Sequence, residues 1–230
     1  MSKHNSIHGV LFDLDGTLYR MRWLMKPLLM FKVFPNSLRL PRFLKVREKF
    51  AGKDLQDRET LLQSICNDLS VVEKTSSAEL RSWILDSFYP GFVYTMKFQK
   101  NGRPGINQTL RGLKDRNIKL AVLSDYDSVN ERLDNLAIDS QHFSVTTSCE
   151  ASGALKPSPK SFLQIANRWG IPPEQLLVVG DRDDTDGAAA RSAGMNFIQI
   201  HDTPSPSGQS MNWFSLQQYL DTLNGSSRPM

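Results

Sequence analysis

The sequence predicts an α/β fold, with a doubly wound parallel sheet core and an inserted all-helical stretch. Four short apolar runs, without alternation of polar residues, are typical of parallel strands that are covered on both faces: 7–12, 118–123, 176–179 and 197–200. Helical patterns separate these runs, as expected of strand–helix–strand units. The stretch 19–103 holds only helical patterns and interrupts the alternation after the first strand. A length of 230 residues suits one domain with an insertion.

The core helices are predicted from apolar residues that recur every three or four positions. These stripes cover residues 106–113, 129–136, 162–169 and 188–193. Ser128 and Glu131 form a candidate capping box, and Gly170 and Gly194 each follow the end of a stripe. Residues 203–210 are rich in Pro, Ser and Gly and predict a loop, after which a last helix is expected around 213–223.

The inserted stretch is predicted to contain several helices. Apolar residues from Leu61 to Val72 recur at helical spacing, and a second helix is expected over 76–88, ended by Pro90 and Gly91. Three further prolines, at 27, 35 and 41, divide the earlier part into short pieces. We therefore expect residues 1–18 and 104–230 to form the core and residues 19–103 to form a separate helical domain.

Composition excludes several classes of protein. An apolar fraction of 40% and a charged fraction of 23% exclude collagen-like, disordered and disulfide-scaffold chains. Cys66 and Cys149 are too few for a disulfide framework and favour a reducing compartment. No apolar run approaches the ~18–20 residues that span a bilayer, and the first residues lack the apolar region of a signal peptide. These observations predict a cytoplasmic protein.

Positive charge is concentrated in residues 20–50. This segment holds nine of the 28 Lys and Arg residues and a single acid, Glu48, so the remainder of the chain is net negative. The segment also carries five large aromatic side chains: Trp23, Phe31, Phe34, Phe43 and Phe50. The simpler interpretation is a helical insertion with a solvated basic face. The alternative is a surface that attracts a phosphorylated substrate, nucleic acid or acidic lipid.

Polar residues follow directly after three of the predicted strands. The first strand runs into residues 13–18 (Asp-Leu-Asp-Gly-Thr-Leu), the second into Ser124 and Asp125, and the third into the acidic loop 180–186. Ligands of open α/β sheets bind outside the carboxyl ends of the strands. We therefore expect these distant residues to meet in one crevice.

The chemistry of that crevice is predicted from its acidic residues, Asp13, Asp15, Asp181 and Asp186. So many carboxylates repel one another unless a hard cation with oxygen ligands, such as Mg²⁺, lies among them. Lys156 and Ser124 would add a positive charge and a hydroxyl donor for a phosphoryl group. One carboxylate could then attack phosphorus, and a second one, two residues on, could transfer protons.

In this order, the motifs resemble those of the haloacid dehalogenase (HAD) superfamily of phosphohydrolases. The matching elements are Asp13–Leu18, Ser124, Lys156 before Pro157, and Gly180-Asp181 with Asp186. The resemblance covers residues from about 7 to 200 and implies a Rossmann-like core. The insertion at 19–103 stands where the family places a helical cap of the C1 type, which closes over the site and selects the substrate.

The resemblance also implies a role for each matched residue. Asp13 would be the nucleophile and Asp15 the general acid and base. The metal would be held by Asp13, Asp15 (through its backbone carbonyl), Asp181 and Asp186. Substrate phosphate would be held by Ser124, Asp125 and Lys156, with backbone N–H groups around Leu14 and Asp125.

The implied activity is that of a Mg²⁺-dependent phosphatase that hydrolyses a small phosphorylated metabolite through an aspartyl-phosphate intermediate. Asp15 disfavours the dehalogenase branch, which lacks an acid there, and Leu14-Asp15-Gly16-Thr17 differs from the Lys-Thr-Gly-Thr of the transport ATPases. A phosphomutase and a non-catalytic anion-binding protein on the same scaffold stay open as alternatives; no nucleic-acid partner is expected. The substrate, the oligomeric state and the choice between Asp184 and Asp186 are left open.

Overall fold

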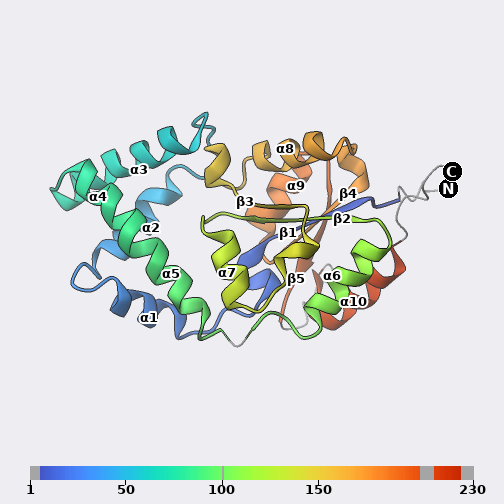
Figure 1. Ribbon diagram of the computed structural model, residues 1–230. Coiled ribbons are helices and arrows are strands. Elements are labelled where there is room, and N and C mark those ends of the chain that lie inside the picture. The colour runs from blue at the N-terminus through green and yellow to red at the C-terminus, as the bar shows by residue number, and fades with distance from the viewer. Residues whose placement is uncertain (1–5, 100, 203–209, 224–230) are drawn as a thin grey trace.

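A six-stranded parallel sheet forms the core of the protein (Figure 1). The structure is a computed structural model that describes residues 6–99, 101–202 and 210–223. The strands are β1 (Gly9–Phe12), β2 (Lys119–Ser124), β3 (Val145–Ser148), β4 (Leu176–Gly180), β5 (Asn196–Ile200) and β6 (Ser210–Met211). Their order is β3-β2-β1-β4-β5-β6, and every neighbouring pair is parallel. This confirms the predicted doubly wound α/β core, whose strand order reverses beside β1.

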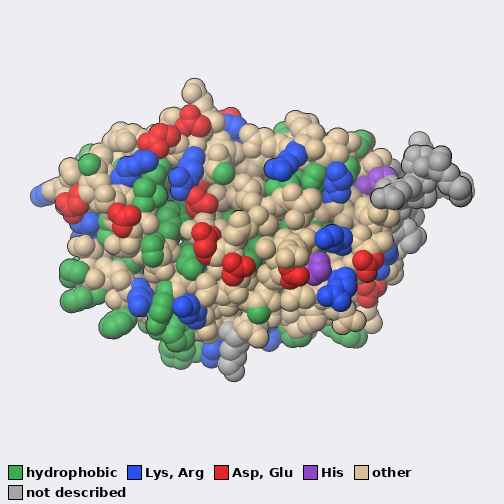
Figure 2. Space-filling view, viewed as in Figure 1, with side chains coloured by type: hydrophobic (Ala, Val, Ile, Leu, Met, Phe, Trp, Pro, Cys, Tyr) green, Lys and Arg blue, Asp and Glu red, His purple; other side chains and the backbone are tan. Residues whose placement is uncertain are grey.

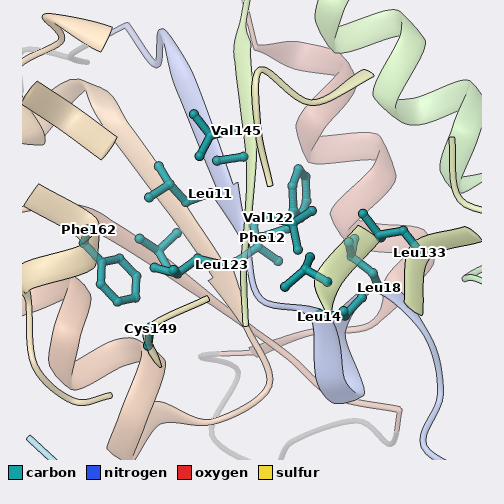
Figure 3. Close-up of a cluster of buried hydrophobic side chains, with 14 of the residues drawn as sticks. Leu11, Phe12, Leu14, Leu18, Val122, Leu123, Leu133, Val145, Cys149 and Phe162 are labelled. Atoms are coloured by element: carbon teal, nitrogen blue, oxygen red, sulfur yellow. The ribbon is translucent and has the colours of Figure 1, made fainter. Parts of the chain in front are cut away.

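The central strands are apolar on both sides because helices cover both faces of the sheet. All residues of β1 and β4 are buried. Figure 3 shows Leu11 and Leu123 on the side of Phe162, and Phe12 and Val122 on the opposite side. Side chains of a strand alternate between faces, so each central strand contributes to two apolar layers.

Helices of the core lie on the two faces of the sheet. One face carries α6 (Ile106–Asp115), α7 (Val129–Asn135) and α10 (Trp213–Thr222), and the other carries α8 (Lys160–Trp169) and α9 (Ala188–Ser192) (Figure 1). Three short 3₁₀ turns, at Ser140–His142, Glu150–Ser152 and Pro173–Gln175, lie in the connections. The predicted helices at 106–113, 129–136, 162–169, 188–193 and 213–223 thus all have counterparts.

Residues 25–96, here called the helical segment, lie beside the sheet rather than on it (Figure 1). Its helices are α1 (Met25–Lys32), α2 (Arg39–Glu48), α3 (Arg58–Glu73), α4 (Ser77–Trp83), the π-helical turn η2 (Ile84–Phe88) and α5 (Tyr89–Met96). The rings of Phe43, Trp83 and Phe88 pack together with centroid separations of 4.8–6.1 Å. The segment therefore has an aromatic core of its own.

Three local expectations were wrong. Pro90 and Gly91 do not end the second inserted helix; the chain stays helical through them, because Pro90 lies in the first turn of α5 and directly after the wide π turn. Ser128 has a φ of 58° and makes no capping bond to α7. β3 and β6 were missed, since β3 contains two threonines and β6 has two residues. Ser210, placed in a loop, starts β6; residues 203–209 of that loop lie outside the described residues.

The two chain crossings between sheet and helical segment run side by side. Arg103 donates from its backbone N–H to Leu18 O at 2.8 Å and from Nε to Thr17 O at 3.0 Å. A second contact between the two parts is a pair of bridges that join Ala51 and Asp54 to the loop before Lys156. Within the described ranges, no helix is both long and apolar enough to cross a membrane.

Candidate active site

The first site residue, Asp13, follows β1 directly and begins a tight turn. Its N–H donates to Val179 O at 2.9 Å, which extends the ladder between β1 and β4 by one bond. The chain then turns through η1 (Leu14–Leu18), where Gly16 has a φ of +84°. A Cβ atom at Gly16 would lie 2.8 Å from Cγ of Asp181, so the turn requires glycine for both its conformation and its close approach to the acidic loop.

Lys156 lies at the centre of the site and is 3% exposed. Its Nζ donates to Asp13 Oδ1 at 2.7 Å and to Leu123 O at 2.9 Å, and it lies 2.7 Å from Asp186 Oδ1. Burial would lower the pKa of Lys156, but the charges of Asp13 and Asp186 outweigh it and raise that pKa. The ammonium therefore stays protonated between two carboxylates.

Three carboxylates converge at the ends of β1 and β4. Asp13, Asp181 and Asp186 each offer an oxygen atom, and these atoms lie within 4.8 Å of one another. Burial raises the pKa of Asp13 well above its usual value, and the neighbouring carboxylates raise it further, against the opposing charge of Lys156. Burial and the charge of Asp186 raise the pKa of Asp181 to about 6. The cluster carries more negative charge than Lys156 alone can balance.

This cluster fits a hard divalent cation. Oxygen ligands from a few carboxylates, close together and partly open to solvent, are the set such ions prefer. Asp186 Oδ1 is buried and, among the described residues, receives no well-aligned hydrogen bond despite the nearby Lys156 ammonium. An acceptor left in this state is one that a cation would satisfy.

The carboxylate of Asp15 points away from that cluster. Both of its oxygens accept from Nη2 of Arg132, and it also accepts from Tyr19 OH at 2.6 Å and from Ser124 Oγ at 3.1 Å. Burial would raise the pKa of Asp15, but the charge of Arg132 and these hydrogen bonds lower it below its usual value. The predicted general acid and base is therefore held as a carboxylate.

Ser124 and Asp125, the predicted phosphate-binding pair after β2, lie in different surroundings. Ser124 Oγ accepts from Arg132 Nη1 at 3.0 Å and from Tyr126 N at 3.1 Å, so its hydroxyl is occupied by protein partners. Asp125 borders the pocket described below, and its Oδ1 accepts from Lys156 N at 3.0 Å. Asp125 thereby fixes the loop that carries Lys156.

The acidic loop separates its four aspartates by environment. Asp183 pairs with Arg191 and Asp184 pairs with Arg182, and both acids are exposed. Asp186 is 2% exposed and faces Lys156. Of the two residues left open by the sequence, Asp186 is therefore the one that joins the carboxylate cluster.

A pocket of about 370 Å³ opens over these groups. Its floor is formed by the carboxylates and Lys156, together with Asp125 and Tyr126. The rest of its wall comes from the helical segment and is mainly apolar, with one charged member, Lys26: Met25, Lys26, Leu29, Leu40, Leu44, Phe88 and Phe92. A pocket of this size, with charged groups at one end and apolar side chains at the other, suits a small ligand with an anionic head.

Sequence reasoning missed Arg132 and Tyr19, which hold Asp15. Arg132 has the largest of the fully buried side chains, and its guanidinium also lies 4.4 Å above the ring of Phe92. In the sequence, Arg132 was one charged residue on a predicted helix. Its place between the apolar Val129 and Leu133 of the same stripe, and thus on the inner face, was the observation that could have found it.

Comparisons with known proteins agree with this geometry. The family described as "Hydrolase: haloacid dehalogenase-like hydrolase" matches residues 7–194. Glyceraldehyde 3-phosphate phosphatase from Methanopyrus kandleri is 36% identical over 99 residues, which are 42% of this chain and 42% of that protein. Phosphoglycolate phosphatase from Aquifex aeolicus is 25% identical over 194 residues, or 80% of each chain. The match thus spans less than half the length of the first relative and most of the second.

Solved structures show the same fold. The 2-haloacid dehalogenase from Pseudomonas syringae pv. Tomato DC3000 has a TM-score of 0.60 and 20% identity, and the similarity covers 93% of this chain and 97% of that one. A HAD phosphatase from Thermococcus onnurineus has a TM-score of 0.58 and 21% identity, with 96% and 100% covered. At these identities the similarity establishes the fold.

Proposed function

This chain belongs to the haloacid dehalogenase-like hydrolases, and we propose that within this family it is a Mg²⁺-dependent phosphatase that hydrolyses a small phosphate monoester. The observation that carries the proposal is the position of Lys156. Its ammonium lies between Asp13 and Asp186, at the floor of a pocket, with a third carboxylate beside them. A cation-lined oxyanion site next to a carboxylate nucleophile is what phosphoryl transfer requires.

The proposed metal ligands are Asp13, Asp181 and Asp186, with the backbone carbonyl of Asp15 as a further ligand. Mg²⁺, when bound, would neutralise these carboxylates and the phosphate oxygens of the substrate. Lys156 would hold the same phosphate from its buried position, and the N–H groups after Asp13 and Ser124 would hold its remaining oxygens.

In the proposed reaction, an oxygen of Asp13 attacks phosphorus while the bond to the leaving oxygen breaks. The product of this step is an aspartyl phosphate at Asp13 and a free alcohol. Water then attacks phosphorus, the acyl-phosphate bond breaks, and Asp13 returns as a carboxylate. Thr17 Oγ1, which donates to Asp13 Oδ2 at 3.0 Å, orients the nucleophile.

Asp15 would transfer the protons of both steps. Its ion pair with Arg132 keeps it as a carboxylate, the form that accepts a proton from the attacking water. The protonated form could donate to the leaving oxygen after the side chain turns from Arg132 toward the pocket, which Asp15 already borders. The acid at this position favours a phosphatase over a dehalogenase.

We also propose that residues 19–103 act as a cap domain on a core of residues 1–18 and 104–230. The support is the pocket itself, whose catalytic floor comes from the core and whose apolar wall comes from the helical segment. The two adjacent chain crossings, joined by Arg103, are suited to let the two parts move about one axis.

The test is the release of phosphate from p-nitrophenyl phosphate, with and without Mg²⁺. We expect Asp13→Asn to abolish metal-dependent release, because the amide is neither a nucleophile nor an anionic ligand. Asp184→Asn is the matched control, since Asp184 is an exposed acid that pairs only with Arg182. Full activity in Asp13→Asn would reject the nucleophile, and turnover that needs a bisphosphate activator would indicate a phosphomutase instead.

A further inference from the structure

The surface over α1 exposes an unusual number of large apolar side chains. Trp23 is 80% exposed, Phe31 and Phe34 are each 76% exposed, and Leu38 is 67% exposed. Together with Met21 and Met30, these residues form what we call the apolar patch (Figure 2, lower left, over the position of α1 in Figure 1). Single exposed apolar residues are common, whereas a group of them on one short segment marks an interaction surface.

These side chains are not needed to pack the helical segment. The inner face of α1 already buries Met25 and Leu29, and Val33 at its end is 2% exposed. α1 therefore has one apolar face in the protein interior, and its outward side exposes Met30 and Phe31 together with Lys26 and Lys32. The exposed side chains of α1 are not needed to pack it against the rest of the protein, so they are available to a partner.

The patch lies in a segment with no negative charge. Between Asp15 and Glu48 the sequence contains no Asp or Glu, and Lys26, Lys32 and Lys45 are exposed. The Nζ of Lys32 lies 3.6 Å above the ring of Tyr94, at the edge of the patch. Arg20, Arg39 and Arg42 of this segment pair with acids from other parts of the chain, so the positive charge beside the aromatic rings comes from the exposed lysines.

We propose that the apolar patch docks the protein onto the surface of a bilayer that contains anionic lipids. Aromatic and aliphatic side chains next to Lys are the composition of interfacial helices, in which the rings enter the boundary between headgroups and acyl chains and the ammonium groups meet lipid phosphates. The patch offers both contributions on α1 and the residues that flank it, without a membrane-spanning segment among the described residues.

Other occupants match the patch less well. A symmetric contact with a second copy would bring the exposed Lys26 and Lys32 of both copies into one interface, where residues 16–47 offer no acid to pair with them. A nucleic acid would balance the charge, but its phosphates would leave Met30, Leu38 and the outward aromatic rings without an apolar partner. A bilayer with anionic headgroups satisfies the charges and the apolar side chains at the same time.

The docking proposal does not depend on the proposed activity, although the two are connected in space. α1 contributes Met25 and Leu29 to the apolar wall of the pocket and carries Met30 and Phe31 of the patch. Docking would therefore bring the pocket wall next to the lipid interface. The experiment below measures binding and needs no turnover.

The test is sedimentation of the full chain with vesicles of phosphatidylcholine alone and of equimolar phosphatidylcholine and phosphatidylglycerol. We expect binding only to the anionic vesicles, with an affinity that falls as salt is raised. The triple variant Trp23→Ser, Phe31→Ser, Phe34→Ser should bind at least about tenfold more weakly, because it lacks the three aromatic rings that would be transferred from water into the bilayer interface. The matched control, Val71→Ser with Phe214→Ser, removes two equally exposed apolar residues outside the patch and should bind as wild type does.

A second variant, Lys32→Gln, keeps all the rings and should weaken binding to anionic vesicles by a smaller factor. Circular dichroism of each variant checks that it is folded. Absence of wild-type binding to anionic vesicles, or equal binding by the triple variant, would overturn the proposal. If the wild type is a dimer and the triple variant is a monomer, the patch binds a second copy. If the wild type binds a nucleic-acid duplex and the triple variant does not, the patch binds nucleic acid. Either result, without vesicle binding, also overturns the proposal.

Discussion

The guanidinium of Arg132 is completely buried, and its charge is balanced by the carboxylate of Asp15. A buried ion pair adds little net stability, because both groups lose their hydration, but it fixes geometry. Here Nη2 of Arg132, with Tyr19 OH, sets the rotamer of the residue that we propose as proton carrier. Arg132 is thus a positioning residue, one contact removed from the chemistry.

We predict that Arg132→Lys lowers kcat by about tenfold to a hundredfold while KM changes little, because one ammonium group cannot replace two nitrogens, of which Nη2 holds Asp15 and Nη1 holds Ser124 Oγ. Steady-state kinetics with p-nitrophenyl phosphate measure the two constants. Arg191→Lys is the control, since Arg191 forms an exposed pair with Asp183 away from the pocket. An unchanged kcat in folded Arg132→Lys would show that the ion pair is structural only.

The sequence was informative about residues whose position follows from strand order. Asp13 and Asp181 each come directly after a buried strand, so their convergence could be predicted without coordinates, whereas Lys156 follows no strand and was placed by the resemblance of its sequence context to a family motif. Arg132 could not be placed in this way, because its partner Asp15 is 117 positions away and the contact depends on how α7 packs. The same holds for Ser124, whose hydroxyl is occupied by neighbours that no motif specifies.

Among the elements, α1 and α2 determine the character of the pocket wall. Leu40 and Leu44 of α2 line the pocket together with Met25 and Leu29 of α1. Apolar walls of this kind favour a leaving group that loses little hydration on entering. The core would bind the phosphate of the substrate, and these helices would contact its leaving group.

We predict that this wall favours phosphate monoesters with apolar leaving groups. Hexyl phosphate should show a higher kcat/KM than glycerol phosphate. Leu44→Gln should reduce the ratio of the two kcat/KM values by about tenfold. Parallel assays of the two esters measure the ratio. Val72→Gln, a half-exposed residue of α3 outside the pocket, is the control and should leave it unchanged. A preference for glycerol phosphate in the wild type would contradict the prediction.

Elements differed in how well their patterns predicted them. The helix over 58–73 has uninterrupted helical periodicity and the central strands are uninterrupted apolar runs, so local sequence was sufficient. The expected helix end at Pro90 was wrong, because a proline in a first helical turn loses no hydrogen bond and so does not stop the helix. β3 pairs with β2 although Thr146 and Thr147 break its apolar run, and only the sheet edge that β2 provides makes it a strand.

At the scale of the whole molecule, the parallel topology concentrates negative charge at one point. The carboxyl ends of β1 and β4 lie side by side, so Asp13 and Asp181 meet, and the turn into α9 adds Asp186. Folding must therefore bring like charges into a half-buried site, at a cost in stability that Lys156 offsets only in part. A cation that binds only the folded chain removes that cost.

We predict that Mg²⁺ raises the Tm of the protein by about 5–10 °C when it exceeds its Kd by about a hundredfold, since binding to the native state alone stabilises it by mass action. Asp181→Asn should lose most of this shift. In the presence of EDTA the variant should melt above the wild type, because one repelling charge is gone and Asn has nearly the same size as Asp and can still form hydrogen bonds. Asp184→Asn should keep the full shift, as Asp184 pairs with Arg182 outside the cluster. Differential scanning calorimetry measures all three proteins at one pH. Because the readout is melting and not turnover, an equal Mg²⁺ shift in Asp181→Asn would remove Asp181 from the metal site whatever its activity, and a wild type that does not respond would remove the site itself.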